Sequence, residues 1–465
     1  MPLQLELTQT IPDRPKNEHR DAHDRDVRSG KKQRYGGKCG SCRRFPAGPL
    51  KAFRNCQYRT RIGGCRYETV KMTPDSTNKG FKDALAWTSD APIGLAVDRA
   101  QGPFLYLEDG SRVTDMISGI AVSSVGHRHP AVISAIQEQI DRHLHVMVYG
   151  EFVQRHQADY AAELTAALPD GLDSVYFTMT GTEANEGALK LAKKATGRSR
   201  MIGFRNSYHG DTHGSLSVTG RDVYRDPFLP LLPDVDFLPF DDIAALKAID
   251  DRVACVITEP IQGEGGIIVP SDAWHKALRD RCTEVGAVLI FDEIQAGFGR
   301  TGSLFAFEQF GVQPDVITLA KAMAGGMPLG AFVASRDMMA AFRNDPPLSH
   351  VTTFGGHPVS CAAARATLRI LQEQNLPERA RWIESVVRQR LKHPAIVEIR
   401  GRGAMLGMLL DDAERTARAV ATCLEKGVLL GWTLHSNNLV RIAPPLTISE
   451  PVLNEALDVI VDALG

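Results

Sequence analysis

The sequence predicts an α/β protein whose main sheet is mostly parallel and covered by helices, with a smaller α+β domain at the C-terminal end. Apolar runs rich in β-branched residues, typical of strands buried on both faces, occur at 253–258, 287–291 and 316–319. Between the first two, residues 272–285 carry apolar side chains at helical spacing. This order of strand, helix and strand indicates βαβ units. From about residue 350 helices alternate with short strands, and the chain closes with an amphipathic helix.

Composition sets broad limits on the class of protein. The 465 residues are 43% hydrophobic and 23% charged, which is ordinary for a globular protein with a sizeable core. A membrane helix needs about 18 consecutive apolar residues. The best run, 316–334, is interrupted by Lys321, two adjacent glycines and Pro328. The chain also opens without the basic and then apolar pattern of a secretory signal, so we expect a cytoplasmic protein with no membrane partner.

Residues 1–71 differ in charge from the rest of the chain. They hold 17 Lys and Arg against 7 Asp and Glu, a net charge of +10, whereas the remaining residues carry −11. This basic leader has no sustained helical or strand period, which favours disorder or a small appended element. In another interpretation Met72 is the natural start of the chain.

Four of the eight cysteines lie in the leader and raise the alternative of a zinc or nucleic-acid module. Cys39 and Cys42 have the spacing of a zinc knuckle, but Cys56 and Cys65 are too far apart for the usual short loop. We therefore expect neither metal nor nucleic acid. The other four cysteines stand singly in apolar or helical contexts, as reduced core cysteines do.

The pattern divides the chain after the leader into three parts. Residues 72–125 are an N-terminal segment expected to pack on the small domain, 126–350 form the large domain, and 351–465 form the small C-terminal domain.

Three ionisable residues, Glu259, Asp292 and Lys321, lie at or just past the carboxyl ends of predicted strands, where open α/β sheets bind ligands. Lys321 has only apolar close neighbours; desolvation lowers the pKa of such an amine and makes it a candidate Schiff-base nucleophile. The alternative is a solvated loop lysine. Asp292 is either a turn cap or a buried carboxylate that needs a cation. A protonated pyridine nitrogen supplies that cation, so the pair matches the requirement of a pyridoxal phosphate enzyme.

A phosphate site is expected where residues 178–183 follow an apolar run and open a helix. Gly181 allows close backbone approach, and acidic residues early in the helix with lysines late in it suit the helix dipole. Tyr208 offers a ring that stacks on a flat cofactor, or else packs in the core.

Seven motifs occur in one order between about residue 80 and the C-terminus. They are GHRHP (126–130), TGTEA (180–184), EPIQGEGG (259–266), FDEIQAGFGRTG (291–302), DVITLAK (315–321), TTFGG (352–356) and RIAPP (441–445). Together they resemble the class III pyridoxal-phosphate-dependent aminotransferases. The resemblance implies the fold type I architecture, with pyridoxal 5′-phosphate as cofactor and no metal.

The resemblance also implies roles for residues at the cofactor. Lys321 would form the Schiff base and shuttle a proton, Asp292 would keep the ring nitrogen protonated, and Gln295 would hydrogen-bond the phenolic oxygen. The cofactor contacts expected besides these are Gly181, Thr182, Tyr208, His209 and, from a neighbouring subunit, Thr353. A shared site makes the working unit a homodimer or a dimer of dimers.

On the substrate side, the resemblance implies that Glu264 and Arg441 act as a switch, and that Ile120 lines the pocket. Arg441 would bind the α-carboxylate of glutamate and turn to Glu264 when an ω-amine donor enters; the alternative is a static salt bridge. Related acetylornithine, ornithine and 4-aminobutyrate enzymes often carry a carboxylate-binding arginine where this chain has Asp211. An aspartate there repels a carboxylate and attracts a second amine.

The function predicted is transfer of an amino group from a diamine or ω-amino acid to 2-oxoglutarate by a ping-pong mechanism. The chain resembles both putrescine and acetylornithine/ornithine aminotransferases, so an enzyme of arginine metabolism is the main alternative. The same fold also serves racemases, aminomutases and decarboxylases, and a pyridoxal-phosphate-binding regulator is a further alternative.

Overall fold

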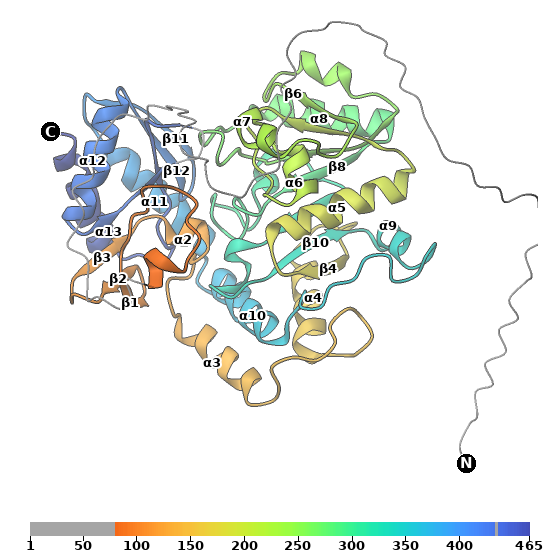
Figure 1. The fold of residues 1–465 in the computed structure, drawn as a ribbon, viewed down its shortest axis with the longest axis horizontal. Helices are drawn as coiled ribbons and strands as arrows, with labels where there is room; N and C mark the ends of the chain where they lie inside the picture. Colours follow the sequence, from red (N-terminus) through yellow and green to blue (C-terminus); the bar gives the residue numbers. More distant parts are fainter. Residues whose placement is uncertain (1–79, 433–435) are drawn as a thin grey trace, which may run out of the picture. The chain divides into compact units, whose positions relative to one another are not determined.

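The computed structural model describes residues 80–432 and 436–465, which form the three sheets and covering helices shown in Figure 1. The predicted α/β class is confirmed, with a large, mostly parallel sheet and a smaller C-terminal part that mixes strands and helices. The leader, and with it the alternatives for residues 1–71 and for Met72, lies outside the described residues.

The largest sheet has seven strands. All its neighbouring strands run parallel except at β10, which is antiparallel to both β4 and β9. Across the sheet the order is β4 (Ser174–Thr178), β10 (Gly330–Ala334), β9 (Val316–Leu319), β8 (Val288–Asp292), β7 (Val253–Thr258), β5 (Arg200–Phe204) and β6 (Val235–Leu238).

The central strands form where the sequence predicts them, because β7, β8 and β9 are buried along their whole length. The predicted helix between the first two is α8 (Asp272–Val285). The Ser271 side chain caps its first turn by accepting from Trp274 N, and it ends at Gly286, whose φ of 69° favours glycine. Its buried face includes Trp274 and Leu278, which pack on the sheet.

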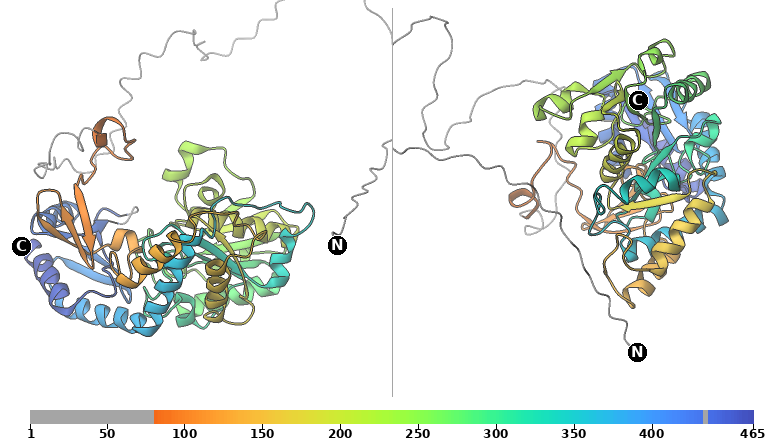
Figure 2. Two further views of the ribbon diagram at one scale, coloured as in Figure 1. Left: turned by 90° about the horizontal axis from the view of Figure 1, so that it is seen from below. Right: turned by 90° about the vertical axis from the view of Figure 1, so that its right-hand side faces the viewer.

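Helices flank this sheet on both sides in Figures 1 and 2. The α-helices are α3 (Pro130–Ile140), α4 (Arg155–Ala166), α5 (Gly181–Thr196), α6 (His213–Val218), α7 (Asp222–Arg225), α9 (Arg336–Met339) and α10 (Pro358–Glu373). Short 3₁₀ turns are η1 (Asp226–Phe228), η2 (Ala244–Ala248), η3 (Ala306–Phe310), η4 (Lys321–Ala324) and η5 (Ala340–Phe342).

The C-terminal part is built on an antiparallel sheet with helices beside it (Figure 2). Its strands, in spatial order, are β11 (Ile396–Arg402), β12 (Met405–Leu410), β15 (Leu439–Ile442) and β14 (Gly431–Trp432). The accompanying helices are α11 (Leu376–Arg390), α12 (Ala413–Glu425) and α13 (Glu450–Ala463). The last of these is the amphipathic helix expected at the end of the chain.

A second small sheet joins distant parts of the sequence. It contains β1 (Val97–Gln101), β2 (Phe104–Leu107), β3 (Arg112–Asp115) and β13 (Val428–Leu429), followed in sequence after β3 by the short turn α2 (Ser118–Ala121). The parallel pairing of β3 with β13 brings the segment before residue 120 against C-terminal residues. The domain boundaries given above stay a prediction.

Two further features concern membranes and cysteines. Among the helices of the described residues, none combines the length and the apolar character that crossing a bilayer requires. The four cysteines of the described residues, Cys255, Cys282, Cys361 and Cys423, are all buried and free.

Candidate active site

A cavity of about 660 Å³ opens at the carboxyl ends of β4, β7, β8 and β9. Ten of the residues singled out in the sequence line it: Gly181, Thr182, Tyr208, His209, Asp211, Glu259, Glu264, Asp292, Gln295 and Lys321. Ile120, Thr353 and Arg441 are not among its lining residues, although Arg441 contacts one of them directly. The sequence therefore predicted ten cavity residues that the fold brings together from five separate segments.

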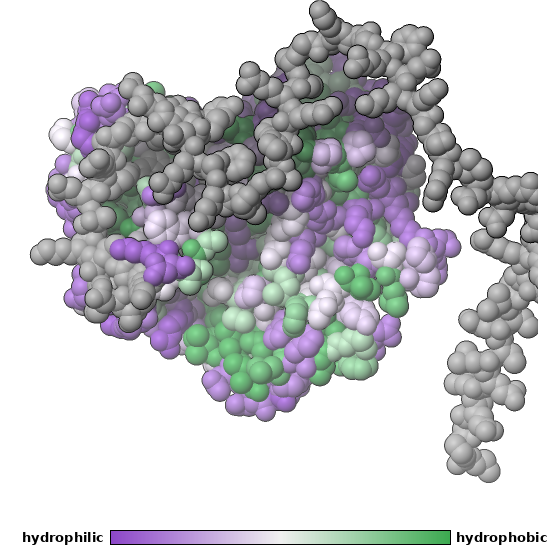
Figure 3. Space-filling model, viewed as in Figure 1, coloured by the Kyte–Doolittle hydropathy of each residue, from purple (hydrophilic) through white to green (hydrophobic). Residues whose placement is uncertain are grey.

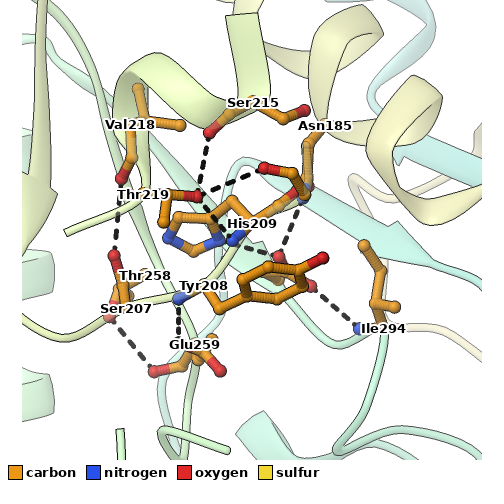
Figure 4. A network of polar contacts seen from close by, with 12 residues as sticks. Asn185, Ser207, Tyr208, His209, Ser215, Val218, Thr219, Thr258, Glu259 and Ile294 are labelled. Carbon is orange, nitrogen blue, oxygen red and sulfur yellow. Dashed lines mark hydrogen bonds and ion pairs between the residues drawn. The ribbon is translucent and has the colours of Figure 1, made fainter. Parts of the chain in front are cut away.

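Asp292 lines the cavity and belongs to a buried network of polar contacts, in which Figure 4 labels its partners Asn185, His209 and Ile294. It is the last residue of β8 and is 4% exposed. Its Oδ2 accepts hydrogen bonds from Asn185 Nδ2 at 2.9 Å and lies 2.8 Å from His209 Nδ1, while Oδ1 accepts from Ile294 N at 3.0 Å. A carboxylate held this firmly at the end of a buried strand presents a fixed negative charge to a bound cation.

Asn185 is a residue of this network that the sequence did not reveal. It lies on α5, fully buried, and its Nδ2 also donates to His209 O at 2.7 Å. Asn185 thus holds both the Asp292 carboxylate and the backbone at His209. The available signal was a buried amide on the apolar face of a helix, a position where a polar side chain needs a specific partner.

Lys321 begins the short η4 turn directly after β9 and keeps part of its surface open to the cavity. Its φ of 44° lies in the left-handed region, a conformation that costs free energy for a residue with a side chain. Burial lowers the pKa of its amine; the negative charge of Glu264 opposes this shift and the positive charge of Arg441 adds to it. A lowered pKa means that a larger fraction of the amine is neutral, as a nucleophile or proton acceptor must be.

The N-terminus of α5 supplies backbone donors at the cavity. Thr180 and Glu183 form a capping box, in which the Glu183 side chain turns back to accept from Met179 N and Thr180 N. The amides of Gly181 and Thr182 belong to the first turn, where the helix itself provides no acceptor. A Cβ on Gly181 would lie 2.7 Å from Ile294 Cδ1, so a larger residue here would require the Ile294 side chain to move.

Tyr208 and Asp211 stand together at the rim. Tyr208 Oη donates to Asp211 Oδ2 at 2.8 Å, and Asp211 is exposed. Burial raises the pKa of Tyr208, and the hydrogen bond to Asp211 raises it further, so the phenol stays protonated. This hydrogen bond fixes the Tyr208 ring beside the cavity and uses one of the two carboxylate oxygens of Asp211.

Glu264, which lines the cavity, forms a buried ion pair with Arg441. Arg441 Nη2 donates to Glu264 Oε1 at 2.5 Å, and the two side chains are 5% and 7% exposed. Gln295 Nε2 also donates to Glu264 Oε1, at 3.4 Å. Arg441 lies on β15 of the C-terminal part, whereas Glu264 follows β7 of the large sheet. The ion pair therefore joins the C-terminal part to the large sheet at the cavity.

Glu259, at the end of β7, is a third buried carboxyl group. Burial raises its pKa to about 7, although Gly263 N and Tyr208 N donate to its oxygens. The bond to Tyr208 N makes Glu259 a support for the residue that carries the ring at the rim. Like Asp292, Glu259 lines the cavity.

These side chains fit pyridoxal phosphate by their chemistry. A buried carboxylate suits a protonated ring nitrogen, the free amides of a helix N-terminus suit a phosphate, and an amine with a lowered pKa suits an aldehyde. The fit requires no residue outside the described part of the chain, apart from any group that a second subunit supplies.

Comparisons with known proteins agree with this chemistry. The pattern of the family described as aminotransferase class-III matches residues 86–464. An acetylornithine aminotransferase of Methanopyrus kandleri is 41% identical over 78% of this chain and 92% of its own length, and a putrescine aminotransferase of Pectobacterium atrosepticum is 38% identical over 84% and 88%. Among solved structures, the ornithine aminotransferase of Toxoplasma gondii aligns with a TM-score of 0.76 at 30% identity, covering 83% of this chain and 93% of that one.

Proposed function

The chain belongs to the class III aminotransferases and uses pyridoxal 5′-phosphate; from that premise we propose that it moves an amino group from a diamine or ω-amino acid to 2-oxoglutarate. The transfer proceeds in two half-reactions at one cavity. One observation carries this proposal: Lys321, Asp292 and the N-terminus of α5 line the same cavity. The Asp292 carboxylate suits a cationic ring nitrogen, and the backbone donors of the α5 N-terminus suit an anionic phosphate.

The cofactor is held by side chains with distinct tasks. Asp292 binds the ring nitrogen and keeps it protonated, while Gly181 and Thr182 bind the phosphate. Tyr208 stacks on the ring and Gln295 hydrogen-bonds its phenolic oxygen. His209 and Asn185 fix the Asp292 carboxylate from behind. When bound, the cofactor supplies an electron-withdrawing ring that stabilises negative charge on the donor carbon.

Lys321 moves the proton in this proposal. Burial lowers the pKa of its amine, so Nζ would take the proton from the donor carbon that bears the amine and, in the second half-reaction, deliver a proton to the carbon of the oxo acid that gains the amino group. The lysine is placed by the strained η4 turn at the end of β9 rather than by a flexible loop.

Arg441 and Glu264 give the cavity two charge states. With the pair closed, the cavity wall is neutral and accepts an amine donor that lacks a nearby carboxylate. When 2-oxoglutarate enters, Arg441 turns from Glu264 to bind its carboxylate bidentately. The alternative is a static ion pair, in which case Arg441 never contacts substrate.

The charge of the rim favours a donor with a second cation. In the part of the chain that the structure describes, no arginine lines the cavity, and Arg441 is committed to Glu264. Asp211 is the exposed carboxylate among the described residues that line the cavity, whereas Glu259 and Asp292 are buried. A distal ammonium, as in putrescine, gains a partner at Asp211, and a distal carboxylate meets a like charge. The acetylornithine and ornithine enzymes among the relatives make such an amino acid the second candidate for the donor.

A homodimer, or a dimer of dimers, completes the site in this proposal. Thr353 is exposed and does not line the cavity of its own chain, and the next residue, Phe354, is 48% exposed. Apolar surface also gathers over α3 in Figure 3, where Ile133 and Ile140 are exposed. A second copy that covers this surface brings its own Thr353 to the phosphate. The free buried cysteines support a location in the reducing cytoplasm.

A panel of amines tests the proposal. The holoenzyme is incubated with putrescine, cadaverine, ornithine, acetylornithine, 4-aminobutyrate or butylamine, and with 2-oxoglutarate or pyruvate as acceptor. We expect glutamate to form from 2-oxoglutarate, with a diamine as the best donor. Racemisation or decarboxylation without amino transfer would contradict the proposal, and a clear preference for acetylornithine would select the second candidate.

A further inference from the structure

A second cavity, of about 520 Å³, opens at the C-terminal end of α5, the helix whose N-terminus meets the active site. None of the described residues lines both cavities. From Gly181 to Lys194 the helix axis rises about 20 Å, at about 1.5 Å per residue, so the two cavities lie at opposite ends of one helix. A ligand in the second cavity therefore contacts none of the residues assigned to the cofactor.

The lining of this second cavity is strongly basic. Its cations are Lys190, Lys193, Lys194 and Arg198, and the other lining residues are Gly197, Ser199, Phe342 and Ser349. Within residues 80–432 and 436–465, no carboxylate lines the cavity or forms an ion pair with any of the four cations. Lysines three and four positions apart on a helix repel one another, and a bound anion would remove that repulsion.

The helix dipole accounts for only part of this arrangement. Cations in the last turn offset the partial negative charge of the helix C-terminus, which suits Lys193 and Lys194. Lys190 lies before that turn, where the effect has faded. Glu186 stands one turn ahead of Lys190, but its Oε1 accepts from Thr212 Oγ1 and from backbone amides at the start of α6. The carboxylate closest to these lysines on the helix is thus used elsewhere.

Two of the cations are held in place by the surrounding backbone. Arg198 Nη1 donates to three backbone carbonyl oxygens, each at 3.0 Å, while its Nε and Nη2 have no acceptor among the described residues. Lys194 Nζ donates to Asn344 O on the facing loop at 2.6 Å. Lys193 Nζ has no hydrogen-bond partner in the part of the chain that the structure describes. A fixed guanidinium with spare donors, beside an unpaired ammonium, suits the oxygens of a phosphate group.

We propose that this second cavity binds a small anion with two or more phosphate groups, such as diphosphate or the phosphate chain of a nucleotide. An anion of this kind carries enough charge to pair with several of the four cations at once, which a single carboxylate does not. The volume of about 520 Å³ lies within the range of about 300–1,000 Å³ that small-molecule sites occupy. Nucleic acids instead bind along extended basic grooves, so the cavity favours a small anion.

The test titrates diphosphate into the full-length holoenzyme by calorimetry, with the ionic strength held constant. Lys193→Gln/Lys194→Gln removes two charges from the cavity, whereas the control Lys247→Gln/Lys276→Gln removes two exposed charges that do not line it. Both variants have the same net charge and the same basic leader, so a difference between them reports the cavity. We expect one diphosphate per chain in the wild type and the control, and about tenfold weaker binding in Lys193→Gln/Lys194→Gln.

Two further probes define the ligand. ATP is compared with tripolyphosphate, which has the same number of phosphate groups. Tighter binding of ATP would assign the site to a nucleotide, and equal binding would assign it to the phosphate chain alone; either supports the proposal. A single-stranded oligonucleotide that binds more tightly than tripolyphosphate, and loses this affinity in Lys193→Gln/Lys194→Gln, would overturn the assignment to a small anion.

The remaining outcomes also decide the question. Absence of diphosphate binding in the wild type, or equal affinity in the wild type and Lys193→Gln/Lys194→Gln, would overturn the proposal. Amino transfer without added diphosphate should be the same in these two proteins, since neither lysine lines the active-site cavity; a loss would overturn the separation of the two cavities. If the double variant fails to fold, the exposed Lys190→Gln replaces it, with binding about threefold weaker expected.

Discussion

Replacement of Asp211 by asparagine removes one charge from the cavity rim and little else. The Asn oxygen can still accept the hydrogen bond that Tyr208 Oη donates at 2.8 Å, so the ring should keep its orientation. The neighbouring residues of the lining are unchanged in size. Any change in donor preference then reports the charge of Asp211 rather than a rearranged site.

The magnitude follows from the exposure of Asp211. Two unit charges 4 Å apart attract by about 4 kcal/mol at an effective dielectric constant of about 20. Asp211 is exposed, and pairs open to solvent retain only about 0.2–1 kcal/mol of such a gain. A donor that closes the rim should leave the pair near the top of that range. We therefore expect Asp211→Asn to lower kcat/KM for putrescine about five-fold.

Putrescine and butylamine form the matched pair of donors for this assay, because they differ only in the distal ammonium group. The ratio of their kcat/KM values should fall about five-fold in Asp211→Asn, with butylamine itself nearly unchanged. Tyr208→Phe removes the hydroxyl group and keeps the Asp211 charge, so it should keep the ratio. Asp211→Arg should move preference towards 4-aminobutyrate.

Two outcomes would refute this reasoning. If the putrescine to butylamine ratio is the same in wild type, Asp211→Asn and Asp211→Arg, the carboxylate does not contact the donor. If the ratio changes equally in Tyr208→Phe, the effect arises from the ring and its orientation rather than from charge. High salt should weaken the wild-type preference, since the pair lies at an exposed rim.

Three other predictions concern stability and the leader. Burial raises the pKa of Glu293 to about 8, so the folded protein holds this proton more tightly than the unfolded chain does. The free energy of unfolding should therefore fall as pH rises from about 4.5 to about 8. The melting temperature of Glu293→Gln should depend less on pH than that of the wild type, and an equal pH dependence of the two would contradict this. Arg300 is fully buried and donates to Ala404 O, Pro444 O and Ser124 Oγ, so Arg300→Met should lower the free energy of unfolding by about 2–4 kcal/mol in a denaturant titration, while the exposed Arg252→Met has little effect. A chain that begins at Met72 should bind cofactor and transfer amino groups like the full chain; lost activity, or stoichiometric zinc in the full chain, would show that the leader has a role of its own.

The sequence predicted the elements whose formation depends on local pattern. The strands at 253–258 and 316–319 and the helix at 272–285 occur with those bounds, because long apolar runs and strong caps define them without help from the rest of the fold. Along α5 the apolar face is buried at Ala184, Ala188, Leu191 and Ala192, whereas Ala195, at the same helical spacing in the last turn, is exposed. Helix ends lie at the edge of the packed core, where spacing carries less information.

Features that depend on distant segments could not be predicted. The pairing of β3 with β13 joins residues more than 300 positions apart, and no local pattern marks it. The left-handed turn at Ser118–Ala121 contains one glycine, and its conformation is held by hydrogen bonds from Ser118 N to Asp115 and from Ser118 Oγ to the distant Ala443 O. Asn185 was missed for a similar reason: its partner Asp292 lies 107 residues away.

The residues of the cavity were predicted from motifs, but their geometry was not. Sequence alone left Asp292 as either a turn cap or a buried carboxylate, and the structure makes it both, since it accepts from Ile294 N and lines the cavity. The roles of Lys321, Asp292 and the other cavity residues stay predictions until they are tested in solution.

Borohydride reduction of the holoenzyme tests the central claim most directly. The protein should be yellow as purified, and reduction should fix one cofactor per chain covalently to Nζ of Lys321, as located by mass spectrometry of its peptides. Lys321→Ala should bind cofactor only reversibly, carry no label after reduction, and fail to complete turnover. A colourless wild-type protein, or a label on any lysine other than Lys321, would contradict the account.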